Sequence, residues 1–471
     1  MTVTATPAPA ERTNSRRPPT WLALLAASLP MFIATLDNLV MTNALPVLRT
    51  ELDASVEQLQ WFINAYTLSF ASLMLMVSTL GDRWGRRRVF VGGIALFTVA
   101  SSASALSTSA EMLIAARAVQ GAGAAAIMPL SLALLASAVS PERRAAAIGV
   151  WGGVSGLGVA VGPVVGGAVV DGFAWQAMFW LNVPVAIVAI PLIRYALSES
   201  KGNKRPIDVI GTLLLGGSVF LGIWGLVNGN EDGWFAPHVV GSLVAAAVLL
   251  PAYVVHAAGR RDAVLPLRLF AHRGFTVANI VALGFSIGMF GAVFLLAQNL
   301  QIVMGYSPFE AGLRTLPWTA APMLVAPIAG VLAGRVGVRV LLVAGIALQA
   351  GALVWLAPLV ESAASYGDLV PAFVMAGVGM GLTFAPSATA VLDGMPDSDF
   401  AIASSANATI REFGVAWGIA MLTAVFLGND GELTPTGYTD AIGPALYVGA
   451  AAVGVALVAA LFAPGRPAPR T

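Results

Sequence analysis

The stretch Gly81-Asp82-Arg83-Trp84-Gly85-Arg86-Arg87-Arg88 is a short basic loop between two long apolar segments of the chain. Its pattern returns 252 residues later, where Leu80, Arg83, Gly85 and Arg87 recur as Leu332, Arg335, Gly337 and Arg339. Each copy joins the second and third apolar segments of a set of six. An internal repeat of this kind indicates two homologous helix bundles, with a substrate handled between them.

The composition around this repeat is typical of a membrane protein. Hydrophobic residues make up 58% of the 471 residues, charged residues only 10%, and the mean hydropathy is +0.82. A soluble chain of this length cannot bury so much apolar surface, so we expect the bilayer to be its solvent. The net charge of +1 gives no reason to expect a nucleic-acid partner.

The sequence carries no residue pattern for catalysis or metal binding. It has no cysteine, and its three histidines share no ligand spacing. It also has no nucleotide-binding loop and no nucleophile elbow. We therefore expect no enzyme activity, no metal and no cofactor, and the energy for transport has to come from an ion gradient or a partner.

Apolar segments of roughly 20 residues, long enough to cross a bilayer as helices, recur fourteen times. They are residues 21–43, 59–80, 89–107, 112–136, 146–169, 174–196, 208–228, 238–257, 275–297, 312–333, 340–359, 369–392, 401–427 and 441–463. The predicted fold is an all-α membrane protein with two six-helix bundles and two inserted helices. Its predicted parts are a cytoplasmic tail (1–20), an N-terminal bundle (21–200), the inserted pair (201–262), a C-terminal bundle (263–463) and a second tail (464–471).

Charged residues predict which ends of the helices face the cytoplasm. Nearly all of the 25 lysines and arginines fall in alternate connections, and an even number of spans puts both termini on that side. Because cytoplasmic loops are enriched in lysine and arginine, we expect both termini in the cytoplasm and the protein in the cytoplasmic membrane. Arg49 and Arg314 lie outside this pattern, and the acidic loop from Asp393 to Asp399 is the one weak inner connection.

Only four ionisable residues lie deep within the predicted spans: Asp37, Arg117, Arg411 and Glu412. Each costs roughly 2.5–3.5 kcal/mol at the centre of a membrane helix, so each is a candidate for function. Asp37 lies about 24 Å along its helix and Arg117 is expected at a similar depth, so the two can pair. The pair is either a static contact that assembles the bundle or a protonation switch, since burial favours the neutral carboxyl and arginine favours the carboxylate.

Glu412 directly follows Arg411 in the thirteenth span. Neighbouring side chains on a helix point about 100° apart, so these two need not pair with each other. Glu412 is either a second proton or cation site or a group that a structural partner neutralises. Both interpretations stay open at this stage.

The basic loop has two interpretations of its own. It is either a topology signal with a tight turn at Gly85, or a latch in which Asp82 and its arginines hold one conformation. Asp82 is placed to cap the next helix or to pair with an arginine across the interface between the bundles. The candidate switch residues are Asp82, Arg83, Gly85, Arg86 and Arg87.

Gly158, Gly162 and Gly166 recur every four residues and therefore share one face of the fifth span. Small residues at this spacing allow two membrane helices to pack closely, and Pro163 adds a potential kink. Other polar and aromatic residues are candidates to line a substrate cavity, although most such residues in a bundle merely bond across helices. The cavity candidates are Asn43, Asn64, Tyr66, Gln298, Asn299, Trp318, Phe384, Asn407 and Arg411.

The basic loop resembles the signature of the major facilitator superfamily, except that Ser78 replaces the usual first glycine and Gly334 the aspartate of the second copy. Further segments are similar to the motifs of its fourteen-helix drug:proton antiporters, in the expected order. They are Leu36-Asp37 with 43–46, 117–123, Gly158 with Gly162-Pro163 and Gly166-Gly167, 175–184, and 306–308 with 311–312. Glu412 departs from the family pattern, which has a neutral glutamine after the arginine.

This resemblance implies export of drugs, dyes or antibiotics in exchange for protons. It also implies that the glycine-rich seam, including Gly167, guards against ion leak. The expected partners are a small lipophilic substrate, protons and membrane lipid, and nothing requires more than a monomer. The alternatives are a solute:proton symporter and a membrane sensor that keeps the fold without transport.

Overall fold

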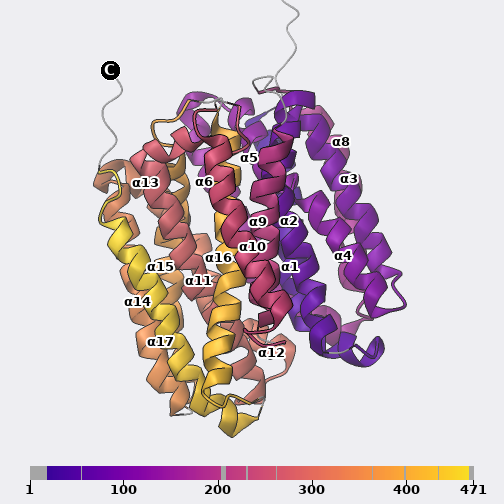
Figure 1. The fold of residues 1–471 in the computed structure, drawn as a ribbon, viewed down its shortest axis with the longest axis vertical. Coiled ribbons are helices and arrows are strands. Elements are labelled where there is room, and N and C mark those ends of the chain that lie inside the picture. The colour runs from indigo at the N-terminus through magenta and orange to yellow at the C-terminus, as the bar shows by residue number, and fades with distance from the viewer. Residues whose placement is uncertain are drawn as a thin grey trace, which may run out of the picture.

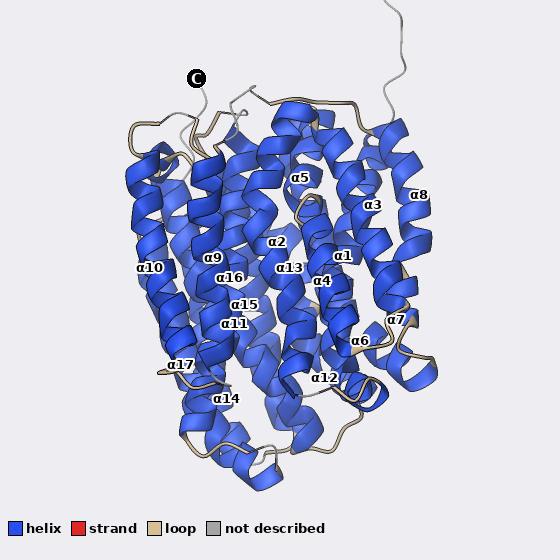
Figure 2. Cartoon of the chain, turned by 45° about the vertical axis from the view of Figure 1, so that its right-hand side comes forward, coloured by secondary structure: helices blue, strands red, loops and turns tan. Residues whose placement is uncertain are grey.

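The computed structural model describes residues 19–54, 56–202, 208–229, 232–260, 262–362, 364–396, 399–432 and 434–465. Every regular element within these residues is a helix (Figure 2). The first part of the chain forms α1 (Thr20–Glu51), α2 (Val56–Trp84), α3 (Arg86–Ala105), α4 (Ala110–Ala124), α5 (Ile127–Ala138), α6 (Pro141–Gly172), α7 (Ala177–Trp180) and α8 (Asn182–Ala196).

The second part repeats this arrangement after an inserted pair. That pair is α9 (Val209–Gly229) and α10 (Pro237–Ala257), followed by the 3-10 helix η1 (Leu267–Ala271). The C-terminal helices are α11 (Arg273–Ile302), α12 (Pro308–Thr319), α13 (Ala321–Val336), α14 (Val338–Glu361), α15 (Tyr366–Leu392), α16 (Phe400–Gly428) and α17 (Pro435–Ala460).

Thirteen stretches of the described residues are helical, long and apolar enough to cross a membrane, and each matches one of the predicted spans. The remaining predicted span, 146–169, lies inside α6, which has 32 residues and is therefore about 48 Å long. The predicted fold class, an all-α membrane protein, is confirmed, and thirteen of its fourteen predicted spans are found as long apolar helices among the described residues.

Three spans that the hydropathy predicts as continuous are interrupted in the structure. The fourth span breaks between α4 and α5. The sixth breaks at Leu181, between the single turn α7 and α8. The tenth span breaks at Ala320, between Pro317 and Pro322. Proline lacks the backbone N–H that would bond one turn back, which explains the last of these breaks.

Helices α1 and α17 begin and end, respectively, at the same end of the bundle (Figure 1). We call this end the terminal face and the other end the opposite face. The loop from Gly81 to Arg88 lies at the terminal face, because α2 ends and α3 begins there. Its counterpart at Gly337 lies at the same face, since Arg339 Nε donates at 2.8 Å to the carbonyl of Ala463, just after the end of α17. Both glycines adopt a positive φ, 114° and 89°.

Two seams join the halves of the molecule. One is formed by α2 against α16, and the other by α6 against α12 and α13. Within the N-terminal half α1 packs against α6 and α8, and within the C-terminal half α11 packs against α16 and α17. The inserted helix α9 contacts both α2 and α16, and α10 packs on α9. The inserted pair therefore covers the first seam.

Glycines permit the closest of these helix contacts. A methyl group on Gly418 of α16 would lie 2.7 Å from the Cα of Ile287 in α11. That distance is shorter than any van der Waals contact. The backbones of α16 and α11 can therefore approach this closely only because Gly418 has no side chain.

We predict that Gly418→Ala destabilises the protein, because overpacking a tight backbone contact costs about 1–3 kcal/mol. The matched control is Gly454→Ala in α17, where the added methyl group meets no atom within 4 Å. Thermal unfolding in detergent, followed by size-exclusion chromatography, should show a lower melting temperature for Gly418→Ala only. Equal melting temperatures for both variants would contradict this view of the interface.

Candidate functional site: a buried ion pair beside a central cavity

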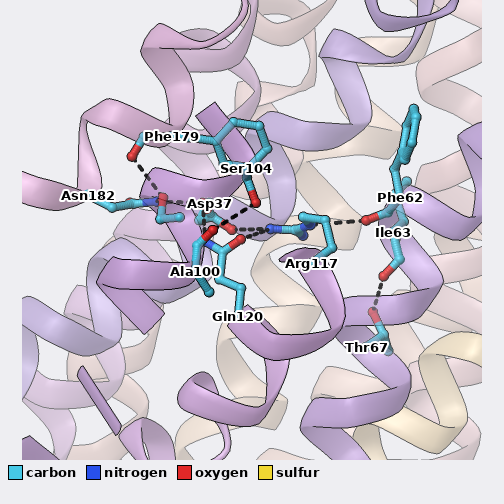
Figure 3. Close-up of polar contacts among 11 residues, drawn as sticks. Asp37, Phe62, Ile63, Thr67, Ala100, Ser104, Arg117, Gln120, Phe179 and Asn182 are labelled. Carbon is cyan, nitrogen blue, oxygen red and sulfur yellow. Dashed lines mark hydrogen bonds and ion pairs between the residues drawn. The ribbon is translucent and has the colours of Figure 1, made fainter. Parts of the chain in front are cut away.

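Arg117 of α4 is completely buried in the middle of the N-terminal half. Its Nη1 donates to Asp37 Oδ2 at 2.6 Å and to Gln120 Oε1 at 2.9 Å, and its Nε donates to the carbonyl of Phe62 at 3.0 Å (Figure 3). The ring of Tyr66 lies 4.4 Å from the guanidinium carbon, a distance at which an aromatic face attracts a cation. The charge of Arg117 is therefore compensated by the Asp37 carboxylate, by the oxygens of Gln120 and Phe62, and by the ring of Tyr66.

Asp37 of α1 is only 5% exposed and accepts bonds from three side chains. Besides Arg117, Gln120 Nε2 donates to Asp37 Oδ1 at 3.0 Å and Asn182 Nδ2 donates to the same oxygen at 2.6 Å. The structure thus brings together the two residues that were expected to pair. It ties α1, α4 and α8 together at one point, since these residues come from three different spans.

Sequence reasoning missed Gln120, Asn182 and Ser101 as members of this site. Ser101 of α3 accepts from Asn182 Nδ2 at 2.8 Å and donates to the carbonyl of Phe179 at 2.8 Å. Gln120 follows Arg117 by three residues, which places both on one helix face and was a usable signal. Asn182 and Ser101 offered none, because buried amides and hydroxyls are common in membrane bundles.

A cavity of about 650 Å³ lies between the two halves, next to the ion pair. Its lining is predominantly apolar and aromatic, with a few polar groups. Six of the predicted residues line it: Asn64, Tyr66, Gln298, Phe384, Arg411 and Glu412. Tyr66 belongs to both features, because it lines the cavity and covers Arg117.

The cavity opens toward the opposite face. Its described lining residues run from the middle of the helices, such as Met31 and Met128, to their opposite ends, such as Leu59, Gln301 and Gly431. Toward the terminal face the halves are in contact, where the hydroxyls of Ser78 and Ser405 lie 2.5 Å apart. The cavity is therefore closed at one membrane surface and accessible from the other.

Four other cavity candidates lie elsewhere. Asn299 and Trp318 are 1% and 3% exposed and belong to the packing of the C-terminal half, outside the cavity lining. Asn407 donates to Asn279 Oδ1 at 3.1 Å, which is a contact between α16 and α11 and also outside the lining. The side chain of Asn43 lies outside the described residues.

Arg411 and Glu412 are the two charged residues in the described lining of the cavity. They contact each other, since Arg411 Nη2 lies 3.4 Å from Glu412 Oε1, although neighbouring side chains diverge on a helix. Both side chains reach this contact because they bend into the same open space. The distance is long for an ion pair, and the other partner of Arg411 Nη2 is the sulfur of Met128 at 3.2 Å.

The glycine-rich face of α6 packs against two neighbours. Added methyl groups on Gly158 and Gly162 would lie 3.0 Å from the Phe32 carbonyl and 2.7 Å from Leu39 Cβ, both on α1. Gly167 faces the other half, where the added group would lie 2.5 Å from the Cα of Phe309 in α12. Gly166 is buried, and the side chain of Pro163 lies outside the described residues.

The basic loop at the terminal face is held from both sides. Asp82 Oδ1 accepts from Arg86 Nε at 2.7 Å within the loop. The N-cap of α3 is Gly85 without a side-chain cap, so of the two roles left open for Asp82, capping of the next helix is the wrong one. Glu199, which follows α8, accepts from the backbone N–H groups of Arg87 and Arg88. Arg83 is exposed.

The acidic loop that ends at Asp399, the one weak inner connection of the predicted topology, has an explanation at this face. Asp399, at the start of α16, is 1% exposed and accepts a two-pronged pair from Arg268 of η1 at 2.6 and 2.9 Å. This bond raises the pKa of the Arg268 guanidinium above its usual range. The acid in this loop is therefore paired with a base from a neighbouring connection, which explains its place among the basic residues.

The sequence model of the Major Facilitator Superfamily matches residues 27–419, which is most of the chain. The chain therefore belongs to this superfamily, which confirms the resemblance inferred from its motifs. It is a multi-pass membrane transporter with a small-molecule substrate, and it is not an enzyme.

Its relatives are named for resistance and export. The cephamycin export protein CmcT of Amycolatopsis lactamdurans is 35% identical over 445 residues, covering 92% of this chain and 91% of the relative. The tetracenomycin C resistance and export protein of Streptomyces glaucescens is 30% identical over 423 residues, covering 89% and 78%. The multidrug resistance protein Stp of Mycobacterium tuberculosis is 32% identical over 407 residues, covering 86% and 75%.

Solved structures share the fold at low sequence identity. The human organic anion transporter MFSD10 superimposes with a TM-score of 0.63 at 14% identity, covering 94% of this chain and 100% of that one. The xylose transporter XylE of E. coli, in a partially occluded inward-open conformation, gives 0.62 at 14%, covering 96% and 99%. Both have the fold that the repeat predicts.

We predict that Asp82→Asn slows transport several-fold and leaves substrate affinity nearly unchanged. The substitution keeps the shape but removes the charge that compensates Arg86, which is 7% exposed, and the described lining of the cavity includes no terminal-face residue. Transport rate and equilibrium binding should be measured together. The control is Asp393→Asn, an exposed acid at the same face. A large loss of binding in Asp82→Asn would contradict a role in switching.

Proposed function

We propose that the protein is a proton-coupled antiporter that exports small lipophilic drugs or antibiotics across the cytoplasmic membrane by alternating access. The export of such compounds is supported by the relatives, which are named for antibiotic export and multidrug resistance. The observation that carries the coupling is the sealed Asp37–Arg117 pair beside an apolar cavity.

The pair has the properties that a proton carrier needs. A carboxylate in a low-dielectric interior is retained in its charged form only by a strong partner, and here Arg117 lies 2.6 Å away. Adding a proton to Asp37 removes most of that attraction and leaves Arg117 as an uncompensated buried charge. The two protonation states therefore favour different positions of α1 relative to Arg117 of α4, and a transport cycle requires such a difference between two conformations.

The basic terminal face lies, in this proposal, in the cytoplasm, and the structure then corresponds to an outward-facing state. The two bundles, residues 21–200 and 263–463, rock against each other around the cavity, and residues 201–262 stay at the seam of α2 and α16. In the outward state a proton from outside reaches Asp37 and promotes substrate release. The protonated carrier returns, loses its proton to the cytoplasm and binds the next substrate.

Purified protein in liposomes with a preset proton gradient tests this function. Its substrate is first chosen from a growth-inhibition panel of chemically diverse antibiotics and cationic dyes. Adding this substrate should dissipate the gradient if the protein is an antiporter. A symporter would dissipate it only when substrate and protons move in the same direction, and a sensor would leave it unchanged.

We predict that Asp37→Asn abolishes gradient dissipation while the protein still reaches the membrane. Asparagine keeps the size of the side chain but cannot carry the proton, and Asp37→Glu should retain part of the coupling. The matched control is Ser104→Ala, which removes a buried hydroxyl of α3 that bonds to the Ala100 carbonyl of its own helix and lies outside both the ion pair and the described cavity lining. Wild-type coupling in Asp37→Asn would refute the assignment of Asp37.

We predict that Glu412→Gln weakens export of a cationic substrate more than export of a neutral one. A carboxylate that faces a low-dielectric cavity attracts a cation, and glutamine keeps the shape without the charge. Efflux of ethidium and of neutral chloramphenicol, each normalised to membrane protein, measures the difference if both are substrates. Equal loss for both would mean that Glu412 only neutralises Arg411, whose unpaired charge then disturbs the protein for every substrate.

A further inference from the structure

Asn182 occupies a position in the buried site that the ion pair alone does not explain. It is the first residue of α8, 1% exposed, and its Nδ2 lies 2.6 Å from Asp37 Oδ1 and 2.8 Å from Ser101 Oγ. Its Oδ1 is buried and makes no hydrogen bond with any described residue. A buried amide oxygen without a partner costs free energy, so its retention needs a reason.

The neighbours determine which way this amide points. An ionised carboxylate only accepts hydrogen bonds, so Asp37 requires the nitrogen of Asn182. Ser101 has one hydroxyl hydrogen, which it donates to the Phe179 carbonyl, so it too can only accept from Asn182. With Asp37 charged, both contacts therefore use the nitrogen, and the amide oxygen is left idle.

A proton on Asp37 reverses this requirement, because a carboxylic acid must donate. Among the described side chains that contact Asp37, Arg117 has only donors, and the oxygen of Gln120 is already used by Arg117 Nη1. The oxygen of Asn182 is the one amide oxygen left free. It is also within reach, since rotating the amide by half a turn places the oxygen where the nitrogen lies now.

We infer that Asn182 is a positioning residue that holds Asp37 in both protonation states, with its nitrogen bound to the carboxylate and its oxygen to the acid. The inference rests on the proposed role of Asp37 as the proton carrier. When a proton from solvent forms the O–H bond on Asp37, the Asn182 amide turns and accepts it. The Ser101 hydroxyl then turns from Phe179 to the same amide oxygen, which releases the Phe179 carbonyl of α7.

This chain of bonds carries the protonation state of Asp37 out of the ion pair. It runs from α1 through α8 to α3 and ends at α7. The charged or titratable groups that face Asp37 from the surrounding helices are Arg117 of α4 and, through Arg117, Tyr66 of α2. The contacts that α3, α7 and α8 contribute come from neutral groups, so the response passes through hydrogen-bond direction and not through a second charge.

The test is the pH dependence of efflux of a dye identified as a substrate, in four variants. In the wild type, the bond from Asn182 to the charged carboxylate is stronger than its bond to the neutral acid. Asn182→Ala removes both bonds and therefore destabilises the carboxylate more than the acid. The pH of half-maximal transport should therefore rise by roughly one unit. Asn182→Asp has nearly the same size but offers no amide N–H to Asp37, and its own charge opposes that of the carboxylate, so it should shift the midpoint further in the same direction.

Ser101→Ala supplies a variant that leaves Asn182 in place. It removes the hydroxyl that holds the amide nitrogen, so turning the amide is easier and the midpoint should rise by a smaller amount. The matched control is Ser104→Ala, one turn further along α3, whose hydroxyl is equally buried but bonds only to the Ala100 carbonyl of its own helix. That variant should keep the wild-type profile.

A second readout tests the acceptor directly. In infrared difference spectra, the C=O stretch of protonated Asp37 should have the frequency of a hydrogen-bonded acid in the wild type and move toward that of a free acid in Asn182→Ala. An unchanged pH midpoint in every Asn182 and Ser101 variant, or an equal shift in Ser104→Ala, would overturn the inference. If Asp37→Asn stays coupled, the proposed function itself fails, whereas an uncoupled Asp37→Asn beside unshifted Asn182 variants overturns the role of Asn182 alone.

Discussion

The electrostatic compensation of Arg117 is the constraint on which the N-terminal half depends. A guanidinium cannot lose its proton, so a fully buried arginine in a membrane span has to be matched by fixed groups around it. Four elements meet this need at one level, with Asp37 from α1, Gln120 from α4 itself, the Phe62 carbonyl from α2 and Asn182 from α8 behind the carboxylate. A change in the charge of Asp37 is therefore felt by every helix that meets there.

The two charge pairs that lie deep within the membrane spans of the described residues, Asp37–Arg117 and Arg411–Glu412, have different surroundings, and this separates two tasks. The Asp37–Arg117 pair is sealed behind Tyr66, with short bonds and little exposure. The Arg411–Glu412 pair bends into the cavity with a long contact of 3.4 Å. We interpret the first pair as the element that responds to protons and the second as the element that meets substrate. Tyr66 separates the first pair from the cavity, since its ring covers Arg117 and also lines the cavity.

The fold followed from the sequence because hydropathy, charge alternation and the repeated loop are each strong signals in a bilayer. The pairing of Asp37 with Arg117 followed from depth alone, because so few charges lie within the spans. Asn182 and Ser101 could not be singled out in this way, since neutral polar residues are frequent in membrane helices and their bonds depend on side-chain directions. The contact between Arg411 and Glu412 was also missed, because helix geometry predicts divergence and says nothing of two side chains that bend into an open cavity.

The interrupted spans show a further limit of hydropathy. The break at Ala320 and the single turn of α7 leave the apolar pattern intact, so only the prolines and glycines nearby hinted at them. These breaks matter for the mechanism, because α7 carries the carbonyl at which the hydrogen-bond chain from Asp37 ends.

The central claim is that substrate and proton compete through Asp37. Its most direct test is proton release from purified protein in weakly buffered detergent solution when substrate is added. The account predicts release by the wild type, none by Asp37→Asn and release by Ser104→Ala, which lies outside the described cavity lining. Equal release by the wild type and by Asp37→Asn would contradict it.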